Sequence, residues 1–289
     1  YGRHRDLHSF PTRRSADLKY GKFWQTYGTL LKEGVSSDFK NKDRLKDLLR
    51  FNSSISEDSS TDVTLKDYVS RMREGQKDIF YVTGGSREAI LHNPNLEYFR
   101  RQGLEVLFLT DQIDDFMVVD LRDYDGKTLK NISQGDIEGI NDSDMSGAES
   151  SLSKEEKSDI LAFFKKQLKD RVSEVSDSKR LVDSPCSLVT PKDGMTAQME
   201  KMMKMMDQKF QGEKRNLEVN MGHPIIQNLS EILQKNKKHP FLEETVEQLY
   251  ENSLLVEGLL ENPVQVLSRY QKFIESASAY ELEKLNRVE

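Results

Sequence analysis

The sequence runs Ile79-Phe-Tyr-Val-Thr-Gly-Gly-Ser86 at the point that decides the fold of its first half. The residues Ile79 to Thr83 are apolar, aromatic or β-branched, which predicts a buried strand that the two glycines end. Ser86 can then cap a helix that we expect to run to about Gln102. A strand that leads directly into a helix is the first half of a β-α-β unit.

Two further segments, the first of them apolar, repeat this alternation of strand and helix. Leu104 to Leu109 predicts a second strand, and Thr128 to Ile132 predicts a third. Between them lie an amphipathic helix around Phe116 and a turn at Asp125-Gly126. Connections of this length favour right-handed crossovers, so the sequence predicts a small three-stranded parallel sheet with helices around it, an α/β arrangement.

The segment before this sheet is predicted to be a helical connector. From Lys19 to Phe51 apolar residues recur at helical spacing, and Asn52 to Asp62 has the serine- and aspartate-rich composition of a loop. Thr64 and Asp67 form an aspartate variant of the capping box, which predicts the start of another helix.

Residues 1–18 differ from the rest of the chain. The string from His8 to Leu18 has no helical or strand period, and it is nearly one translated frame of a common sequencing-library adapter. We therefore predict that residues 1–18 are a foreign, disordered segment. The alternative is a natural, disordered N-terminus.

A domain boundary is predicted within residues 131–153. The stretch from Asn141 to Ser153 has the composition of a linker, so residues 19–130 form one domain and residues 154–289 form another. The second domain mixes helices with short apolar strands, which predicts an α+β fold. Its expected elements are a helix from Lys154, strands within 172–181, 186–190 and 217–221, a methionine-rich helix from Met195, and helices from about Ile225, Pro240 and Pro263.

The last two helices carry apolar stripes in which the spacing alternates between four and three residues. Such a stripe favours a partner helix at a shallow crossing angle. A hairpin of two such helices either packs on its own domain or joins a second hairpin in a four-helix bundle between two chains, and periodicity leaves both open. The stripe residues are Leu242, Val246, Leu249, Val256 and Leu260 on one helix and Val266, Tyr270, Phe273 and Ala277 on the other.

The composition excludes several classes of protein. The 289 residues carry 43 Lys and Arg against 49 Asp and Glu, a net charge of −6, which is unlike the basic surface of a nucleic-acid-binding protein. We find no apolar run long enough for a membrane span and no signal peptide. The single cysteine, Cys186, excludes an internal disulfide. We therefore predict a cytoplasmic protein without nucleic-acid or membrane partners.

No catalytic, metal or cofactor site is predicted. Gly84-Gly85 follows a strand and opens a helix, where phosphates bind in α/β folds, but no nucleotide-binding motif is present and a capping turn is the favoured interpretation. Asp111, Asp114 and Asp115 are better explained by a helix cap than by a metal.

The most unusual segment is a run of methionines from Met195 to Met206. At about 100° per residue, five of them share one helical face. A buried face is the ordinary interpretation, but flexible and polarizable methionines are also typical of surfaces that adapt to varied partners. We favour a partner-binding face of Met195, Met199, Met202, Met203 and Met206.

Several segments, in order and at matching spacing, resemble the HtpG chaperones, bacterial members of the ninety-kilodalton heat-shock protein family. The resemblance spans nearly all of the chain after residue 18. The segments that carry it are Lys22 to Gly34, Arg44 to Phe51, Asp67 to Gly84, Gly103 to Thr110, Ile113 to Phe116, Asp125 to Lys127, Arg180 to Pro185 and Met195 to Met199.

This resemblance implies a function for each part of the chain. Residues 19 to about 130 correspond to the end of the family's middle domain, and the remainder corresponds to its C-terminal dimerisation domain, whose last helices form a four-helix bundle between two chains. The methionine helix matches an exposed helix that binds unfolded client proteins, and Phe116 matches an aromatic position that faces the same cleft. The expected partners are therefore a second copy of the chain and non-native proteins.

The resemblance also implies what this chain lacks. In the family, ATP and magnesium are bound by an N-terminal domain that the chain does not contain, and the arginine that reaches the γ-phosphate lies upstream of Lys19. We therefore expect that the chain alone is not an enzyme, whereas its full-length parent is an ATP-hydrolysing stress-response chaperone. The rival hypothesis is a stand-alone enzyme that binds a nucleotide at Gly84-Gly85.

Overall fold

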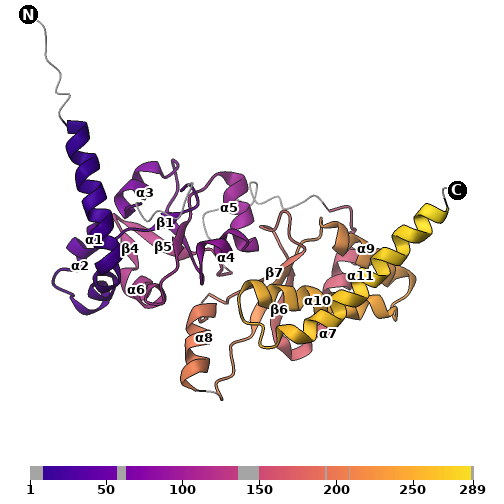
Figure 1. The fold of residues 1–289 in the computed structure, drawn as a ribbon. Helices are drawn as coiled ribbons and strands as arrows, with labels where there is room; N and C mark the ends of the chain where they lie inside the picture. The colour runs from indigo at the N-terminus through magenta and orange to yellow at the C-terminus, as the bar shows by residue number, and fades with distance from the viewer. Residues whose placement is uncertain (1–8, 57–62, 136–149, 193, 208, 288–289) are drawn as a thin grey trace, which may run out of the picture. The chain divides into compact units, whose positions relative to one another are not determined.

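A computed structural model describes residues 9–56, 63–135, 150–192, 194–207 and 209–287. The chain divides into two compact units, of which the first contains residues 1–91 and 99–132 and the second contains residues 92–98 and 133–289. Helices and two small sheets make up the fold, which confirms the predicted α+β class (Figure 1). The predicted linker at 141–153 lies almost entirely outside the described residues.

The sheet of the first unit contains the three predicted strands, paired in parallel as expected. β2 (Asp78–Thr83) lies between β3 (Leu107–Leu109) and β5 (Lys127–Asn131). The sheet is wider than predicted because two short strands extend its edges, β1 (Asn52–Ser53) against β3 and β4 (Asp123–Tyr124) against β5.

These edge strands differ in how visible they are in the sequence. β1 begins the segment that was expected to be a loop, and its two residues are too few to show an alternating pattern. β4 and β5 are joined by Asp125 and Gly126 at φ 49° and 71°, the positive angles of a tight hairpin turn. The turn was predicted, but the strand before it was not.

The helix predicted from Ser86 to Gln102 is wrong as a single element. It consists of α4 (Arg87–Leu91), a 3-10 turn (Pro94–Leu96) and α5 (Glu97–Gln102). Pro94 explains the break, because proline lacks the N–H that a continuous helix needs and disfavours helical geometry in the residue before it. The Asn93 side chain caps the new turn by accepting the N–H of Asn95 at 2.9 Å.

The helices of the first unit begin with α1 (Ser9–Ser37), followed by α2 (Lys42–Leu48) and α3 (Leu65–Arg71). Residues 9–18 form the first turns of α1, which corrects the expectation of disorder for them. Pro11 is compatible with this helix because it lies in the first turn, where proline is tolerated. Residues 1–8 lie outside the described residues, and the foreign origin of 1–18 stays a prediction.

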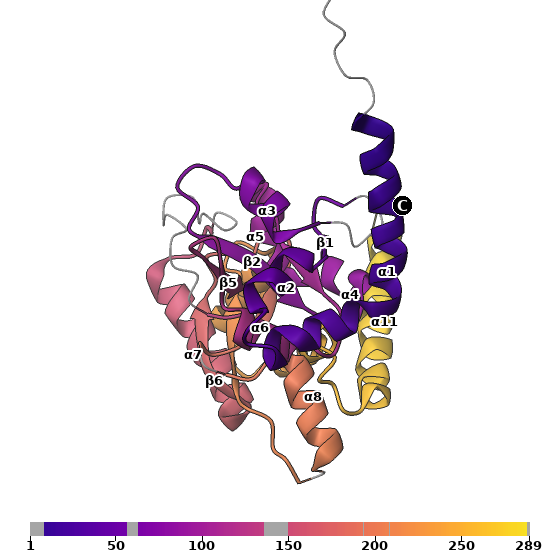
Figure 2. The ribbon, with the colours of Figure 1, turned by 90° about the vertical axis from the view of Figure 1, so that its left-hand side faces the viewer.

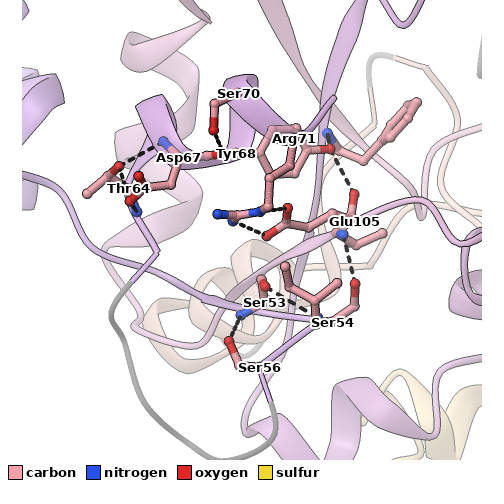
Figure 3. Close-up of polar contacts among 12 residues, drawn as sticks. Ser53, Ser54, Ser56, Thr64, Asp67, Tyr68, Ser70, Arg71 and Glu105 are labelled. Atoms are coloured by element: carbon pink, nitrogen blue, oxygen red, sulfur yellow. Dashed lines mark hydrogen bonds and ion pairs between the residues drawn. The ribbon is translucent and has the colours of Figure 1, made fainter. Parts of the chain in front are cut away.

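The predicted capping box at the start of α3 is present, since Thr64 accepts the N–H of Asp67 at 2.9 Å and Asp67 accepts that of Thr64. Figure 3 shows this box and, on the same helix, the guanidinium of Arg71, which donates two hydrogen bonds to the carboxylate of Glu105. The Tyr68 hydroxyl donates to the Glu105 carbonyl at 2.8 Å. These contacts fix α3 against the segment that enters β3.

A buried ion cluster joins α1 to α6 (Asp114–Leu121). The Nζ of Lys32 lies 2.6 Å from Asp111 Oδ2 and 2.8 Å from Asp114 Oδ1, and it also lies above the Trp24 ring. Asp114 is completely buried, and burial raises the pKa of its carboxyl to about 6. Asp111 and Asp114, two of the three aspartates that the sequence assigned to a helix cap, are therefore partners of a buried lysine.

The second unit is a three-stranded sheet with helices packed on it. β8 (Arg215–Val219) lies between β6 (Val172–Asp177), which is parallel to it, and β7 (Cys186–Val189), which is antiparallel. The helices are α7 (Lys154–Leu168), α8 (Ala197–Met206), α9 (Pro224–Lys235), α10 (Pro240–Val256) and α11 (Pro263–Asn286). Side chains from α7, α9 and α10 form the core with the sheet.

The buried carboxyl of Asp114 predicts a pH-dependent stability. A folded-state pKa raised from 3.8 to about 6 means that the stability contribution is present below pH 4 and is lost as the pH rises through 6. Between pH 4 and pH 7, ionisation of Asp114 should therefore lower the free energy of unfolding by about 2–3 kcal/mol. In Asp114→Asn this decrease should be absent. Urea unfolding followed by the fluorescence of Trp24, the one tryptophan, measures it. Parallel pH profiles for the two proteins would contradict the prediction.

Candidate functional site

The methionine-rich helix α8 is attached to the second unit by its charged side. Glu200 is the one buried residue of α8, all of whose residues are described, and it is 4% exposed. Its Oε2 accepts a hydrogen bond of 2.6 Å from Nη1 of Arg215, the first residue of β8. The helix projects from the rest of its unit in both ribbon views (Figures 1 and 2).

The beginning of α8 is also held by polar contacts. Thr196 caps the helix by accepting the N–H of Met199 at 3.2 Å. Just before it, the N–H of Met195 donates to Glu213 Oε2 at 2.9 Å, and the Met195 carbonyl accepts from Arg215. One turn further on, Lys204 lies 3.0 Å from Glu261. The attachment is therefore made by ion pairs and backbone hydrogen bonds.

The predicted methionine face lies outside both cores. Met195, Met199, Met202 and Met203 are half-buried, and Met206 is 76% exposed. None of these five side chains belongs to either hydrophobic cluster of buried residues. On a helix with 100° per residue, Glu200 lies roughly 115° and Lys204 roughly 155° from the centre of the methionine face. The apolar side of α8 is thus the side that the ion pairs leave outward.

Phe116, the aromatic residue predicted to share this surface, lies on α6 in the first unit. Its side chain is 36% exposed, and that of Val119 on the same helix is 55% exposed. Phe116 is therefore accessible, and its neighbours Asp115 and Met117 are buried. Because Phe116 and the methionines belong to different units, a joint surface stays a prediction.

The stripe predicted for α10 is occupied within the second unit. Leu242, Val246 and Leu249 are at most 5% exposed and belong to the core cluster formed with the sheet. Val256 is 37% exposed, and Leu260 is half-buried. The first three side chains therefore stabilise this unit itself, whatever the assembly state.

The stripe predicted for α11 faces α10. Val266 is buried, the ring of Phe273 packs edge-on against Phe241 at 5.8 Å, and the Tyr270 hydroxyl donates to Asn252. Ion pairs of Arg269 with Glu251 and of Lys272 with Glu244 lie along the same contact. Ala277 is exposed. A helical hairpin packed on its own domain accounts for most of the predicted stripe.

A second apolar stripe on α11, which the sequence analysis missed, is exposed. Its members are spaced by three, seven, eight and three residues, and these spacings place them on one face of a helix with 100° per residue. We call it the outward stripe of α11. Its members are Val264, Leu267, Ile274, Leu282 and Leu285, which are between 57% and 70% exposed.

The glycines at the end of β2 are explained by packing. A Cβ on Gly84 would lie 2.6 Å from Cγ1 of Ile90, and the Gly84 N–H already donates to the Leu109 carbonyl. Ser86 accepts the N–H of Ala89 at 3.2 Å, as a capping residue does. The glycine is therefore needed for the close approach of α4, and the turn gives no support to a phosphate site.

Two histidines and the cysteine, which are residue types that often take part in catalysis, have structural roles here. His223 and His239 cap α9 and α10 by accepting backbone N–H groups at Nδ1. Cys186 is buried, which raises the pKa of its thiol to about 11. Among the described residues, no group of three or more His, Cys, Asp or Glu is placed to hold a metal. No described helix is long and apolar enough to cross a membrane.

Comparison with known proteins places the chain in a family. The family model described as Hsp90 protein matches residues 5–288. The chain belongs to the Hsp90 family. Chaperone protein HtpG of Chlorobium luteolum is 41% identical over 263 residues, which cover 90% of this chain and 41% of that protein. The matched range includes part of residues 1–18, so the foreign origin of that segment stays a prediction.

Two further relatives give the same result. Chaperone protein HtpG of Chlorobaculum tepidum is 42% identical over 272 residues, with 90% of this chain and 41% of that protein covered. The same-named protein of Geobacter sulfurreducens is 42% identical over 241 residues, with 83% and 37% covered. The Hsp90-family chain thus spans about two fifths of the length of the curated relatives it matches, and a nucleotide-binding enzyme is not favoured.

Two alanine substitutions test whether Gly84 is needed for packing. Gly84→Ala should lower the free energy of unfolding by about 1–3 kcal/mol, because its Cβ would overlap Ile90. Gly85→Ala is the matched control, since no atom lies within 4 Å of its added Cβ, and it should be close to neutral. Urea unfolding measures both. Equal effects of the two substitutions would contradict the packing explanation.

Proposed function

We propose that this chain binds non-native proteins through the methionine face of α8 together with Phe116, and that two copies of the chain form a dimer. It does so as part of a longer, ATP-dependent cytoplasmic chaperone of the stress response, whose ATP and magnesium are held outside the chain. Membership of the Hsp90 family supports the chaperone class. The single, buried cysteine is consistent with a reducing compartment.

The observation that carries client binding is the attachment of α8 by its charged side. A helix normally buries its apolar side, and α8 buries Glu200 instead. The methionines remain accessible as long, unbranched side chains that can fit apolar segments of different shape. Such contacts are individually weak, but a dimer would present two copies and gain avidity.

The outward stripe of α11 supports a dimer. It runs along a helix of 24 residues, roughly 36 Å long, and its side chains find no cover within the described chain. Several large apolar side chains exposed on one helix face are typical of an interface between proteins. Two copies of one helical hairpin can pair about a twofold axis, which places the same stripe on both sides of the contact.

The client-binding proposal predicts that Met199→Ser with Met203→Ser reduces the suppression of client aggregation. Both side chains lie outside the cores, so the melting temperature should change by only a few degrees. Light scattering of an aggregating client and thermal unfolding measure the two effects. Met205→Ser is the matched control, because Met205 is 83% exposed and points roughly 110° away from the centre of the face. A large drop in melting temperature would return the two methionines to the core.

The dimer proposal predicts that Leu267→Glu with Ile274→Glu gives monomers in sedimentation experiments. Both side chains are more than half exposed, so the charges should disrupt the contact between copies while the helical circular dichroism is retained. Leu30→Glu on α1, at a residue 60% exposed, is the control and should leave the dimer intact. A dimer that persists in the double variant would refute the role of the outward stripe.

A further inference from the structure

The ion pair between Glu200 and Arg215 is almost completely buried. The two side chains are 4% and 5% exposed, and Glu200 Oε2 lies 2.6 Å from Arg215 Nη1. A second nitrogen of Arg215, Nη2, donates to the Met195 carbonyl at 3.3 Å. The remaining nitrogen, Nε, is buried without a hydrogen-bond partner among the residues that the structure describes.

Stability does not explain such a pair. Removing two charges from water costs several kcal/mol per ion, and apolar side chains of similar size in their place are often neutral or stabilising. A buried, unpaired N–H costs roughly another 1–3 kcal/mol. An ion pair differs from apolar packing in one useful respect, since it is directional. The hydrophobic effect, by contrast, is not directional and would tolerate a rotated helix.

The segment that follows α8 is shaped around the Glu200 carboxylate. A Cβ on Gly212 would overlap Oε1 and Cδ of Glu200, although the Gly212 backbone has no positive φ that would itself require glycine. The glycine is therefore needed for space beside the carboxylate. Its neighbour Glu213 accepts the N–H of Met195 at 2.9 Å. The segment after α8 thus lies against the Glu200 carboxylate and, through Glu213, also contacts the residue just before the helix.

We propose that Glu200 and Arg215 are positioning residues that fix the rotation of α8 about its own axis. The pair keeps the charged side of the helix against the second unit and thereby holds the methionine face outward. A rotation by one residue, about 100°, would move Glu200 out of reach of Arg215, and in one direction it would bring the methionines to the side that Glu200 now occupies. This inference rests on the client-binding role proposed above.

The experiment places a reporter thiol on the methionine face by Met203→Cys. The rate at which a soluble maleimide modifies it is compared with the rate for Cys186, whose burial and raised pKa make it a reporter of core opening. The test variant is Glu200→Met with Arg215→Met, which removes the directional contact but keeps side-chain volume. Gly212→Ala is a second variant, which displaces the carboxylate and keeps both charges.

The matched control is Glu231→Met with Lys235→Met on α9. This is the same change of an ion pair to two methionines, at side chains that are 66% and 73% exposed. This control should change the modification rate of neither thiol. In both test variants the reporter at 203 should react roughly fivefold to tenfold more slowly, because burial raises the pKa of a thiol and lowers its thiolate fraction. The Cys186 rate should stay unchanged.

Each result decides the question. A slower reporter with an unchanged Cys186 rate supports positioning, whereas faster modification of both thiols would show that the pair only stabilises the core. Unchanged rates in both test variants would also overturn the proposal. Client aggregation assays on the same variants separate the two roles. If Met199→Ser with Met203→Ser leaves client binding intact, the proposed function fails, while the thiol rates still report on the rotation of α8.

Discussion

The core of the second unit takes up one whole side of α10, and this packing determines which apolar surfaces are left for other proteins. Leu242, Val246 and Leu249 are buried with the sheet, and α11 is held against α10 by Val266, by the Phe241–Phe273 ring contact and by flanking ion pairs. The apolar side chains on the inner side of the hairpin are therefore already packed within one chain. The apolar surface that remains is on α11, at Leu267, Ile274 and their neighbours in the outward stripe.

The same reasoning applies to α8, except that α8 is attached to its unit by charged side chains instead of apolar ones. A helix that packs through apolar side chains hides the surface with which it could bind other apolar segments. Attachment through Glu200 and Arg215 reduces this conflict, because the buried contact of α8 is an ion pair and the methionines belong to neither hydrophobic core. The cost is a desolvated ion pair with one unsatisfied nitrogen, which a core built for stability alone would avoid.

The parts of the fold that could be predicted from the sequence are those set by local signals. The strands β2 and β3 lie in continuous apolar runs, β5 follows the turn signal at Asp125-Gly126, and the Thr64 and Asp67 capping box depends on residues three apart. The break at Pro94 had a local signal that the helical pattern around it outweighed. β1 and β4 had almost none, since two residues cannot show a period and their pairing is decided by distant strands.

The candidate site shows the same division. Helical spacing was enough to place Met199, Met202, Met203 and Met206 on one side of α8, whereas Met195 precedes the cap of the helix. The spacing did not indicate which side faces the unit, because Arg215 lies fifteen residues from Glu200 and on a different element. On α11 two stripes were present, and only the position of α10 decides which one is covered.

Lys204 connects α8 with the turn that leads into α11. Its Nζ lies 3.3 Å from Glu200 and 3.0 Å from Glu261, a residue of that turn. Glu261 is 81% exposed, so this outer ion pair contributes little energy. The position of α8 against its unit therefore depends on the buried Glu200–Arg215 pair, whereas the contact of Lys204 with Glu261 adds little to it.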